Sequence, residues 1–127
     1  MLPASLNKVI AAGSIDRHDH TINDGHCVDL WAPGVDVQVP VPAALMHHGH
    51  PPYVNASGTS FAAALVSGVA AEFFSNKLNQ DAHAMVGELR KDALKDQIYM
   101  PKDEGDGSVS MQLSDKPRVV QAVRTSW

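Results

Sequence analysis

Cysteine and aromatic residues are scarce in this sequence, which has one cysteine, Cys27, among 127 residues and 6% aromatics. One cysteine cannot form an internal disulfide, so packing and hydrogen bonds must hold the fold together. We expect Cys27 to be a small buried apolar residue rather than a reactive thiol. Apolar residues make up 44% of the chain, which is enough for the core of one domain.

Positive charge is not in excess either, because the sequence has 10 Lys and Arg residues and 14 Asp and Glu residues, which gives a net charge of −4. This balance argues against nucleic acid as the main partner, since phosphate-binding surfaces are basic. No apolar run approaches the roughly 18 residues that would span a bilayer. No signal peptide with basic and apolar parts precedes Leu2. We therefore expect neither nucleic acid nor a membrane as a partner, and the localisation stays open.

The most informative segment, residues 55–68, has the sequence NASGTSFAAALVSG. It predicts a small-residue turn that leads directly into an apolar helix. Gly58 allows a tight turn that a side chain would obstruct. Thr59 or Ser60 can cap the first turn of the helix, where free N–H groups and a positive dipole end lie beside a hydroxyl. Such a position suits a nucleophilic oxygen and the oxyanion that it generates.

The remaining pattern predicts an α/β fold. Apolar runs and breakers indicate three strands, at Lys8–Ser14, Val28–Ala32 and Val35–Val39. Val41–Ser57, with its three prolines, is expected to be a long loop. Val109–Leu113 and Arg118–Val123 are compatible with two strands, or with a strand and a helix.

Two helices are predicted, at Thr59–Ser75 and Asp81–Leu94. The second is amphipathic and begins at a capping aspartate. The first is apolar on nearly every face, which is typical of a helix in a protein interior. Two or three strands cannot cover such a helix, so its large apolar residues should not all be buried: Phe61, Leu65, Val69, Phe73 and Phe74.

Three segments together resemble the subtilisin-like serine peptidases. Gly58–Ala62 (GTSFA) is similar to the nucleophile motif of that family, and Val28–Gly34 (VDLWAPG) to the segment that precedes it. Leu2–Ser5 followed by Val9–Asp16 resembles a strand further upstream. The resemblance covers about residues 2–100, which we expect to be the C-terminal portion of a peptidase domain. Residues 101–127 would then form a tail of undetermined structure.

This resemblance implies a parallel sheet with a buried central nucleophile helix and a following amphipathic helix. It makes Ser60 the nucleophile, and the backbone N–H of Ser60 half of the oxyanion hole. Leu2, Pro3 and Ala4 would lie near the wall of the substrate pocket, and Asp29 near a weak calcium site. A peptide or protein would be the substrate. Family members are commonly secreted, and no cofactor is implied.

The resemblance also implies catalytic partners that this sequence does not match. In the family the triad runs Asp, His, Ser along the chain, and both partners would lie before the segment that matches Leu2. We therefore expect the isolated chain to be inactive until an upstream segment completes it. The alternative is a non-catalytic remnant that acts as a binding module or comes from an incomplete gene model. Ala64 and Leu65 also replace the proline and histidine that usually follow the nucleophile.

Seven histidines raise two further hypotheses, a substitute base and a metal site. His47, His48 and His50 are near Ser60 in sequence, but no family motif places a base there. His18-Asp19-His20 and His47-His48-Gly49-His50 contain good ligands for zinc or copper. Neither matches a defined ligand pattern, so we predict no metal site at these histidines.

Overall fold

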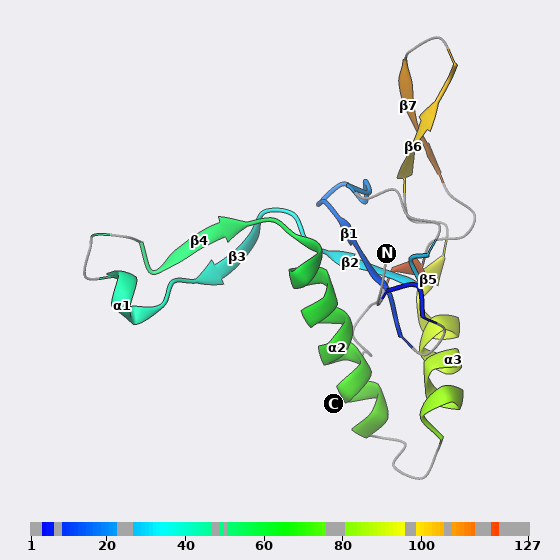
Figure 1. Cartoon of the computed structure of the whole chain (residues 1–127), viewed down its shortest axis with the longest axis horizontal. Coiled ribbons are helices and arrows are strands. Elements are labelled where there is room, and N and C mark those ends of the chain that lie inside the picture. The colour runs from blue at the N-terminus through cyan, green and yellow to red at the C-terminus, as the bar shows by residue number, and fades with distance from the viewer. Residues whose placement is uncertain are drawn as a thin grey trace.

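The structure is a computed structural model that describes residues 4–6, 9–22, 27–46, 49, 51–75, 81–95, 99–105, 108–113 and 118–119. It combines helices with a partly parallel sheet, as the sequence predicts for an α/β fold (Figure 1). In chain order the elements are β1 (Ala12–Ile15), β2 (Leu30–Pro33), β3 (Val37–Pro40), α1 (Ala43–Met46), β4 (Tyr53–Ala56), α2 (Thr59–Ser75), α3 (Ala82–Asp92), β5 (Leu94–Lys95), β6 (Tyr99–Asp103), β7 (Val109–Leu113) and β8 (Arg118–Val119).

The main sheet has the strand order β1-β2-β8-β5. β1 pairs in parallel with β2 from Ala12↔Leu30 to Ile15↔Pro33, and β8 continues the parallel arrangement beside β2. β5 pairs antiparallel with β8 and forms the other edge of the sheet. The strand predicted at Lys8–Ser14 therefore begins four residues later, and that predicted at Val28–Ala32 begins two residues later. β8 brings a segment from beyond residue 100 into the centre of this sheet.

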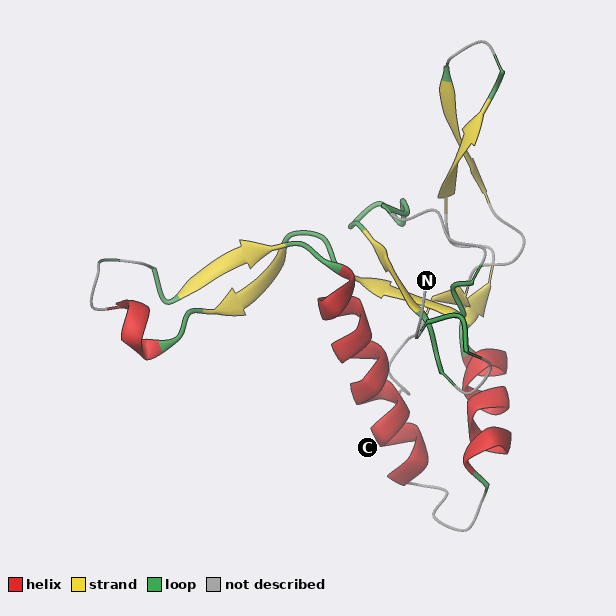
Figure 2. Ribbon diagram, in the orientation of Figure 1, coloured by secondary structure: helices red, strands yellow, loops and turns green. Residues whose placement is uncertain are grey.

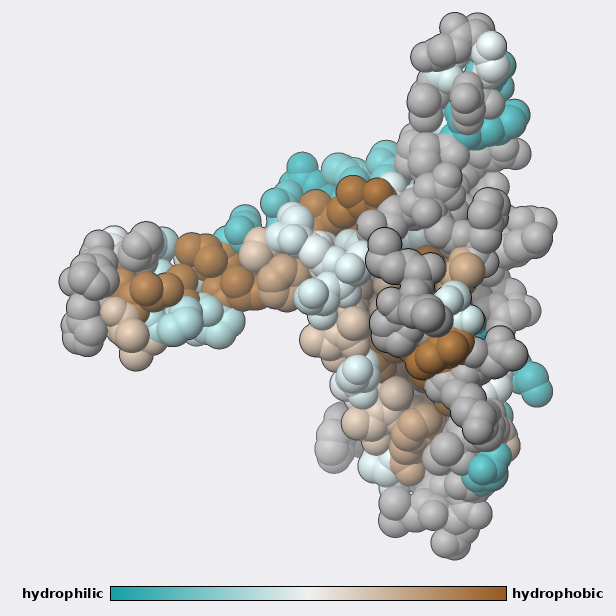
Figure 3. Space-filling view, viewed as in Figure 1, coloured by the Kyte–Doolittle hydropathy of each residue, from teal (hydrophilic) through white to brown (hydrophobic). Residues whose placement is uncertain are grey.

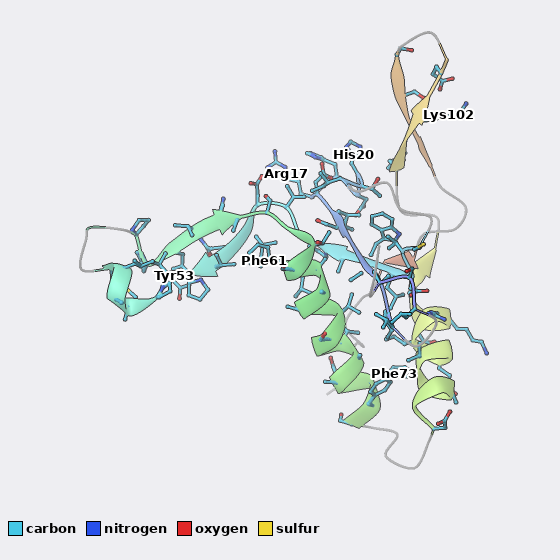
Figure 4. The ribbon with its side chains drawn as sticks, viewed as in Figure 1. Arg17, His20, Tyr53, Phe61, Phe73 and Lys102 are labelled. Atoms are coloured by element: carbon cyan, nitrogen blue, oxygen red, sulfur yellow. The ribbon has the colours of Figure 1, made fainter. Side chains whose placement is uncertain are left out.

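Both long helices lie on the same face of the main sheet (Figure 1). The core on this face joins Leu30 and Ala32 of β2 to Phe73 of α2 and Leu89 of α3. Figure 4 shows Phe73 between the two helices. Because side chains alternate along a strand, Trp31 points to the opposite face, where it forms a second small cluster with Ile15.

α2 has the bounds that the sequence predicts, but it is covered on one face only. Its buried residues are spaced by about one turn: Ala62, Val66, Ala70 and Phe73. Leu65, on another face, remains 45% exposed. Of the five large apolar residues that were expected not to be buried together, only Phe73 is buried, which confirms that prediction.

The segment predicted as a loop, Val41–Ser57, contains α1 and β4, so this prediction is wrong. β4 pairs antiparallel with β3 from Val37↔Ala56 to Pro40↔Tyr53. β3, α1 and β4 form an arm that projects beside the start of α2 (Figure 2). Apolar side chains gather along this arm (Figure 3), where four large residues are at least 38% exposed: Leu45, Met46, Tyr53 and Val54.

β6 and β7 form a second antiparallel hairpin, in register from Tyr99↔Leu113 to Asp103↔Val109. Val109–Leu113 is a strand, and so is Arg118–Val119, the described part of the second segment, which agrees with the alternative of two strands. β6 was not predicted. Among the described residues, none of the helices is long and apolar enough to cross a membrane.

Candidate active site

Ser60 lies in the first turn of α2, immediately after the base of the arm, and its side chain is exposed. The first four N–H groups of a helix have no partner within it. The backbone N–H of Ser60 is one of these groups, and the positive end of the helix dipole lies at the same place. Within the described part of the chain, the Ser60 hydroxyl makes no hydrogen bond, so the expected capping role is not observed.

The start of α2 is fixed to the end of β2 by two glycines. The Gly58 N–H donates a hydrogen bond to the Gly34 carbonyl at 2.7 Å, and the Gly34 N–H donates to the Ile15 carbonyl at 3.1 Å. A Cβ at Gly34 would overlap Ser14 Oγ and lie 2.9 Å from the Gly58 carbonyl oxygen. The close approach of β1, β2 and the turn before Ser60 therefore requires a glycine at position 34.

Gly58 does not play the steric role that was expected of it. A Cβ there would meet the Phe61 ring at 3.8 Å and the Ser60 backbone nitrogen at 3.9 Å, which are ordinary contacts, and the φ of Gly58 is not in the left-handed region. Figure 4 shows Phe61 in this first turn of α2. The turn instead depends on Ser57, whose Oγ accepts a hydrogen bond from the Asp36 N–H at 3.0 Å. Asp36 itself has φ 51°, which is uncommon for a residue other than glycine.

The described histidines with placed side chains, His18 and His20, surround Asp16 rather than Ser60. Their Nδ1 atoms lie 3.8 and 3.6 Å from Asp16 Oδ2. The His20 ring also packs edge-on against Tyr99, with 5.7 Å between ring centroids. Across the described residues, no group of three His, Cys, Asp or Glu side chains could hold a metal ion. His26, His47, His48 and His50 lie outside those residues, so their part in the site stays a hypothesis.

The pKa of Asp16 is lowered in the folded chain. Partial burial of the carboxyl opposes this change, but the backbone N–H groups of His20 and His18 donate hydrogen bonds to Oδ1 at 2.9 and 2.7 Å. The two imidazoles favour the charged carboxylate as well. The carboxylate therefore stabilises the loop between β1 and Thr21 in its ionised form.

Asp16 should make folding stability depend on acid pH. Because its pKa is lower in the folded than in the unfolded chain, its contribution is complete above the ordinary value of about 3.9 and is lost as the pH falls through the folded value. We expect Asp16→Asn to be less stable than the unchanged chain at pH 7, with this difference disappearing as the pH falls below the lowered pKa of the folded chain. Urea unfolding at several pH values measures it. A difference that is the same at every pH would contradict the assignment.

Asp29 connects two distant parts of the fold. Its Oδ2 accepts a hydrogen bond from the Ala11 N–H at 3.0 Å, and its Oδ1 accepts one from Arg90 Nη2 at 2.7 Å. Arg90 belongs to α3, and both side chains are about one-third exposed. Asp29 thus ties the start of β1 to α3. A calcium ion at this carboxylate would have to displace the Arg90 guanidinium, and the expected weak site stays a prediction.

Asp29→Asn should lower the free energy of unfolding by about 2 kcal/mol, because hydrogen bonds to a charged group contribute about 1.5–3 kcal/mol. An amide has one acceptor oxygen, so it cannot accept both bonds in the same geometry, and the substitution also removes the negative charge beside the Arg90 guanidinium. Urea unfolding measures the change. Asp92→Asn is the matched control, since Asp92 is exposed at the end of α3, the helix that also carries Arg90. Equal effects of the two substitutions would show that the Asp29–Arg90 contact contributes nothing.

Ala4 is the described member of the expected substrate wall, and Leu2 and Pro3 lie outside the described residues. Ala4 is exposed and lines a hollow of about 420 Å³ with Ser5, Leu6, Val9, Cys27, Asp29 and Arg90. Ser60 is not part of this lining, so Ala4 stays a prediction as a substrate contact. Cys27 is exposed, which corrects the expectation of a buried residue.

Comparison with known proteins agrees with this α/β fold. The family model of the subtilase family matches residues 1–112, and the chain belongs to that family, which is one of serine peptidases. Over 90% of its length it superposes on a cold-adapted subtilisin-like serine proteinase, with a TM-score of 0.64 and 26% identity.

Two curated relatives are similar in sequence. A subtilase-type proteinase of Saccharomyces cerevisiae, RRT12, is 36% identical over 83 residues, which is 62% of this chain. The proprotein convertase subtilisin/kexin type 9 of Rattus norvegicus is 34% identical over 116 residues, which is 80% of this chain. The matched region spans 16% of each relative and 39% of the cold-adapted proteinase.

Proposed function

We propose that Ser60 is the nucleophile of a serine endopeptidase whose domain is completed by residues outside these 127. The observation that carries the proposal is the exposed Ser60 hydroxyl in the first turn of α2, held against β2 by the Gly58–Gly34 hydrogen bond. This places a hydroxyl with no competing partner among the described residues at a helix N-terminus. In that position its oxygen would attack the scissile carbonyl of a peptide or protein.

The backbone N–H of Ser60 would supply one donor to the resulting oxyanion. A donor that is already oriented stabilises developing charge without reorganisation, and removing one such donor typically costs about 10²–10³-fold in rate. The fixed attachment of α2 to β2 provides this orientation. The second donor would come from the segment that completes the domain.

A serine hydroxyl also needs a base within hydrogen-bonding reach, oriented by a third group. His18 and His20, whose side chains are described, are engaged with Asp16 instead. We therefore infer that the base and its orienting carboxylate come from the completing segment, and that the 127-residue chain alone does not turn over peptides.

A fluorophosphonate probe tests the proposal, because it labels only a serine that a base has activated. The probe is applied to the 127-residue chain alone and to the chain co-expressed with the sequence encoded immediately upstream. Labelling only in the second case, abolished by Ser60→Ala, supports the proposal. Labelling of the chain alone would show that it contains its own base. Absence of labelling in both cases would favour the alternative, a non-catalytic binding module. The observation that supports this alternative is the exposed apolar face of α2 around Leu65.

A further inference from the structure

The arm carries an acceptor sequence for a covalent modification. Asn55-Ala56-Ser57 is an Asn-x-Ser tripeptide whose middle residue is not proline, which is the pattern of N-glycosylation. Asparagines at positions 7, 23, 76 and 79 are not followed by Ser or Thr two residues later. We propose that Asn55 is an N-glycosylation site when the chain passes through a secretory compartment.

The geometry of the arm places Asn55 in solvent. Asn55 lies in β4 opposite Gln38 of β3, and both residues are exposed. Because residues alternate across a strand pair, Gln38, Pro40, Tyr53 and Asn55 share one face of the arm. The other face carries Val37, Val39, Val54 and Ala56, of which three are half-buried. The acceptor thus lies on the open side of the two-stranded ribbon.

The side-chain amide of Asn55 is also accessible to a transferase, because it makes no hydrogen bond within the described part of the chain. Tyr53 lies two residues earlier on the same face and is 55% exposed (Figure 4). Its ring offers an apolar surface against which the first sugar of a glycan can rest. A glycan would therefore cover part of an arm that is otherwise rich in exposed apolar side chains.

The reaction takes its sugar from a donor, a polyprenyl-diphosphate-linked oligosaccharide, and is carried out by an oligosaccharyltransferase. Asn55 Nδ2 attacks the anomeric carbon of the first sugar and forms the new carbon–nitrogen bond. The bond between that carbon and the diphosphate oxygen breaks, and the lipid diphosphate leaves with the electron pair. Nδ2 loses one proton to a base of the transferase. No oxidant or reductant is consumed.

Translation of the chain behind a cleavable secretion signal, in the presence of microsomes, tests the proposal without requiring the chain to fold. We expect protease-protected product with an added mass that peptide-N-glycosidase removes, leaving Asp at position 55. Asn55→Gln should abolish the added mass. Ser57→Thr should retain it, because the acceptor pattern is preserved. Protease-protected product without any added mass would overturn the proposal.

A second measurement addresses the folded chain. Because Asn55 is exposed, enzymatic removal of the glycan should leave the thermal midpoint of unfolding lower by no more than a few degrees. Failure of the glycosylated chain to fold where Asn55→Gln folds would contradict the placement of Asn55 on the open face. Ser60→Ala should be glycosylated as fully as the unchanged chain, so this test is independent of the proposed peptidase function.

Discussion

Gly34→Ala should lower the free energy of unfolding by about 3 kcal/mol, at the upper end of what overpacking a close contact typically costs. The added methyl group would overlap Ser14 Oγ, which is 1% exposed, and would approach the Gly58 carbonyl oxygen to 2.9 Å. Both neighbours are constrained, because Ser14 is in β1 and Gly58 is bonded to Gly34 itself. Relief of the overlap must therefore move the turn before Ser60.

Gly68→Ala is the matched control for this substitution. Gly68 is exposed in the middle of α2, and a Cβ there would meet nothing within 4 Å. Alanine is favoured over glycine in a helix by about 0.8–1 kcal/mol, so this variant should be more stable than the unchanged chain. Chemical unfolding should show that the two substitutions change the free energy of unfolding in opposite directions. A neutral or stabilising Gly34→Ala would show that the contact between β2 and the turn is not as close as described.

The sequence predicted the centre of the fold well, because local signals agree there. A run of small and apolar residues after Gly58, interrupted only by Glu72, gives α2 its correct bounds, Thr59–Ser75. Asp81 precedes α3 as the predicted cap position. Pro33 and Gly34 end β2 where breakers are expected. In each case the residues that specify the element lie within it or next to it.

The elements that the sequence did not predict depend on distant partners. β4 has four residues and follows two prolines, so its own pattern favours a loop, and only pairing with β3 makes it a strand. β6 contains Pro101 and is a strand because β7 pairs with it. The Asp29–Arg90 ion pair joins residues 61 positions apart. A local sequence pattern cannot predict a contact between residues so far apart in the chain.

The sequence motif predicts a candidate nucleophile, Ser60, but not the residues that hold the turn before it in place. The motif points to Ser60 because a hydroxyl after a small-residue turn at a helix start has a defined chemistry. The residue that sterically requires glycine is Gly34, which is 26 positions earlier, and not Gly58. That role appears only when β1, β2 and the start of α2 are placed together, since it arises from their mutual distance.

Ser60→Ala should lower the peptidase rate of the completed domain by about 10⁶-fold, which is the size known for loss of the nucleophile in subtilisin, a member of this family. The loss is large because base, orienting carboxylate and nucleophile act as a unit. The loss of rate should appear as a lower kcat, and KM should change little, because the Ser60 hydroxyl adds little to ground-state binding. Hydrolysis of a chromogenic peptide by chain and upstream segment together measures both constants.

Ser67→Ala distinguishes this loss from a general effect of shortening a serine on α2. Ser67 is exposed, and its hydroxyl donates a hydrogen bond to the Ala63 carbonyl at 2.8 Å within the helix. Such a bond competes with the helix backbone, so its removal should leave both stability and rate close to those of the unchanged chain. An equal loss in the two variants would show that α2 is merely structural. Unchanged activity in Ser60→Ala would assign the nucleophile to another residue and refute the proposed function.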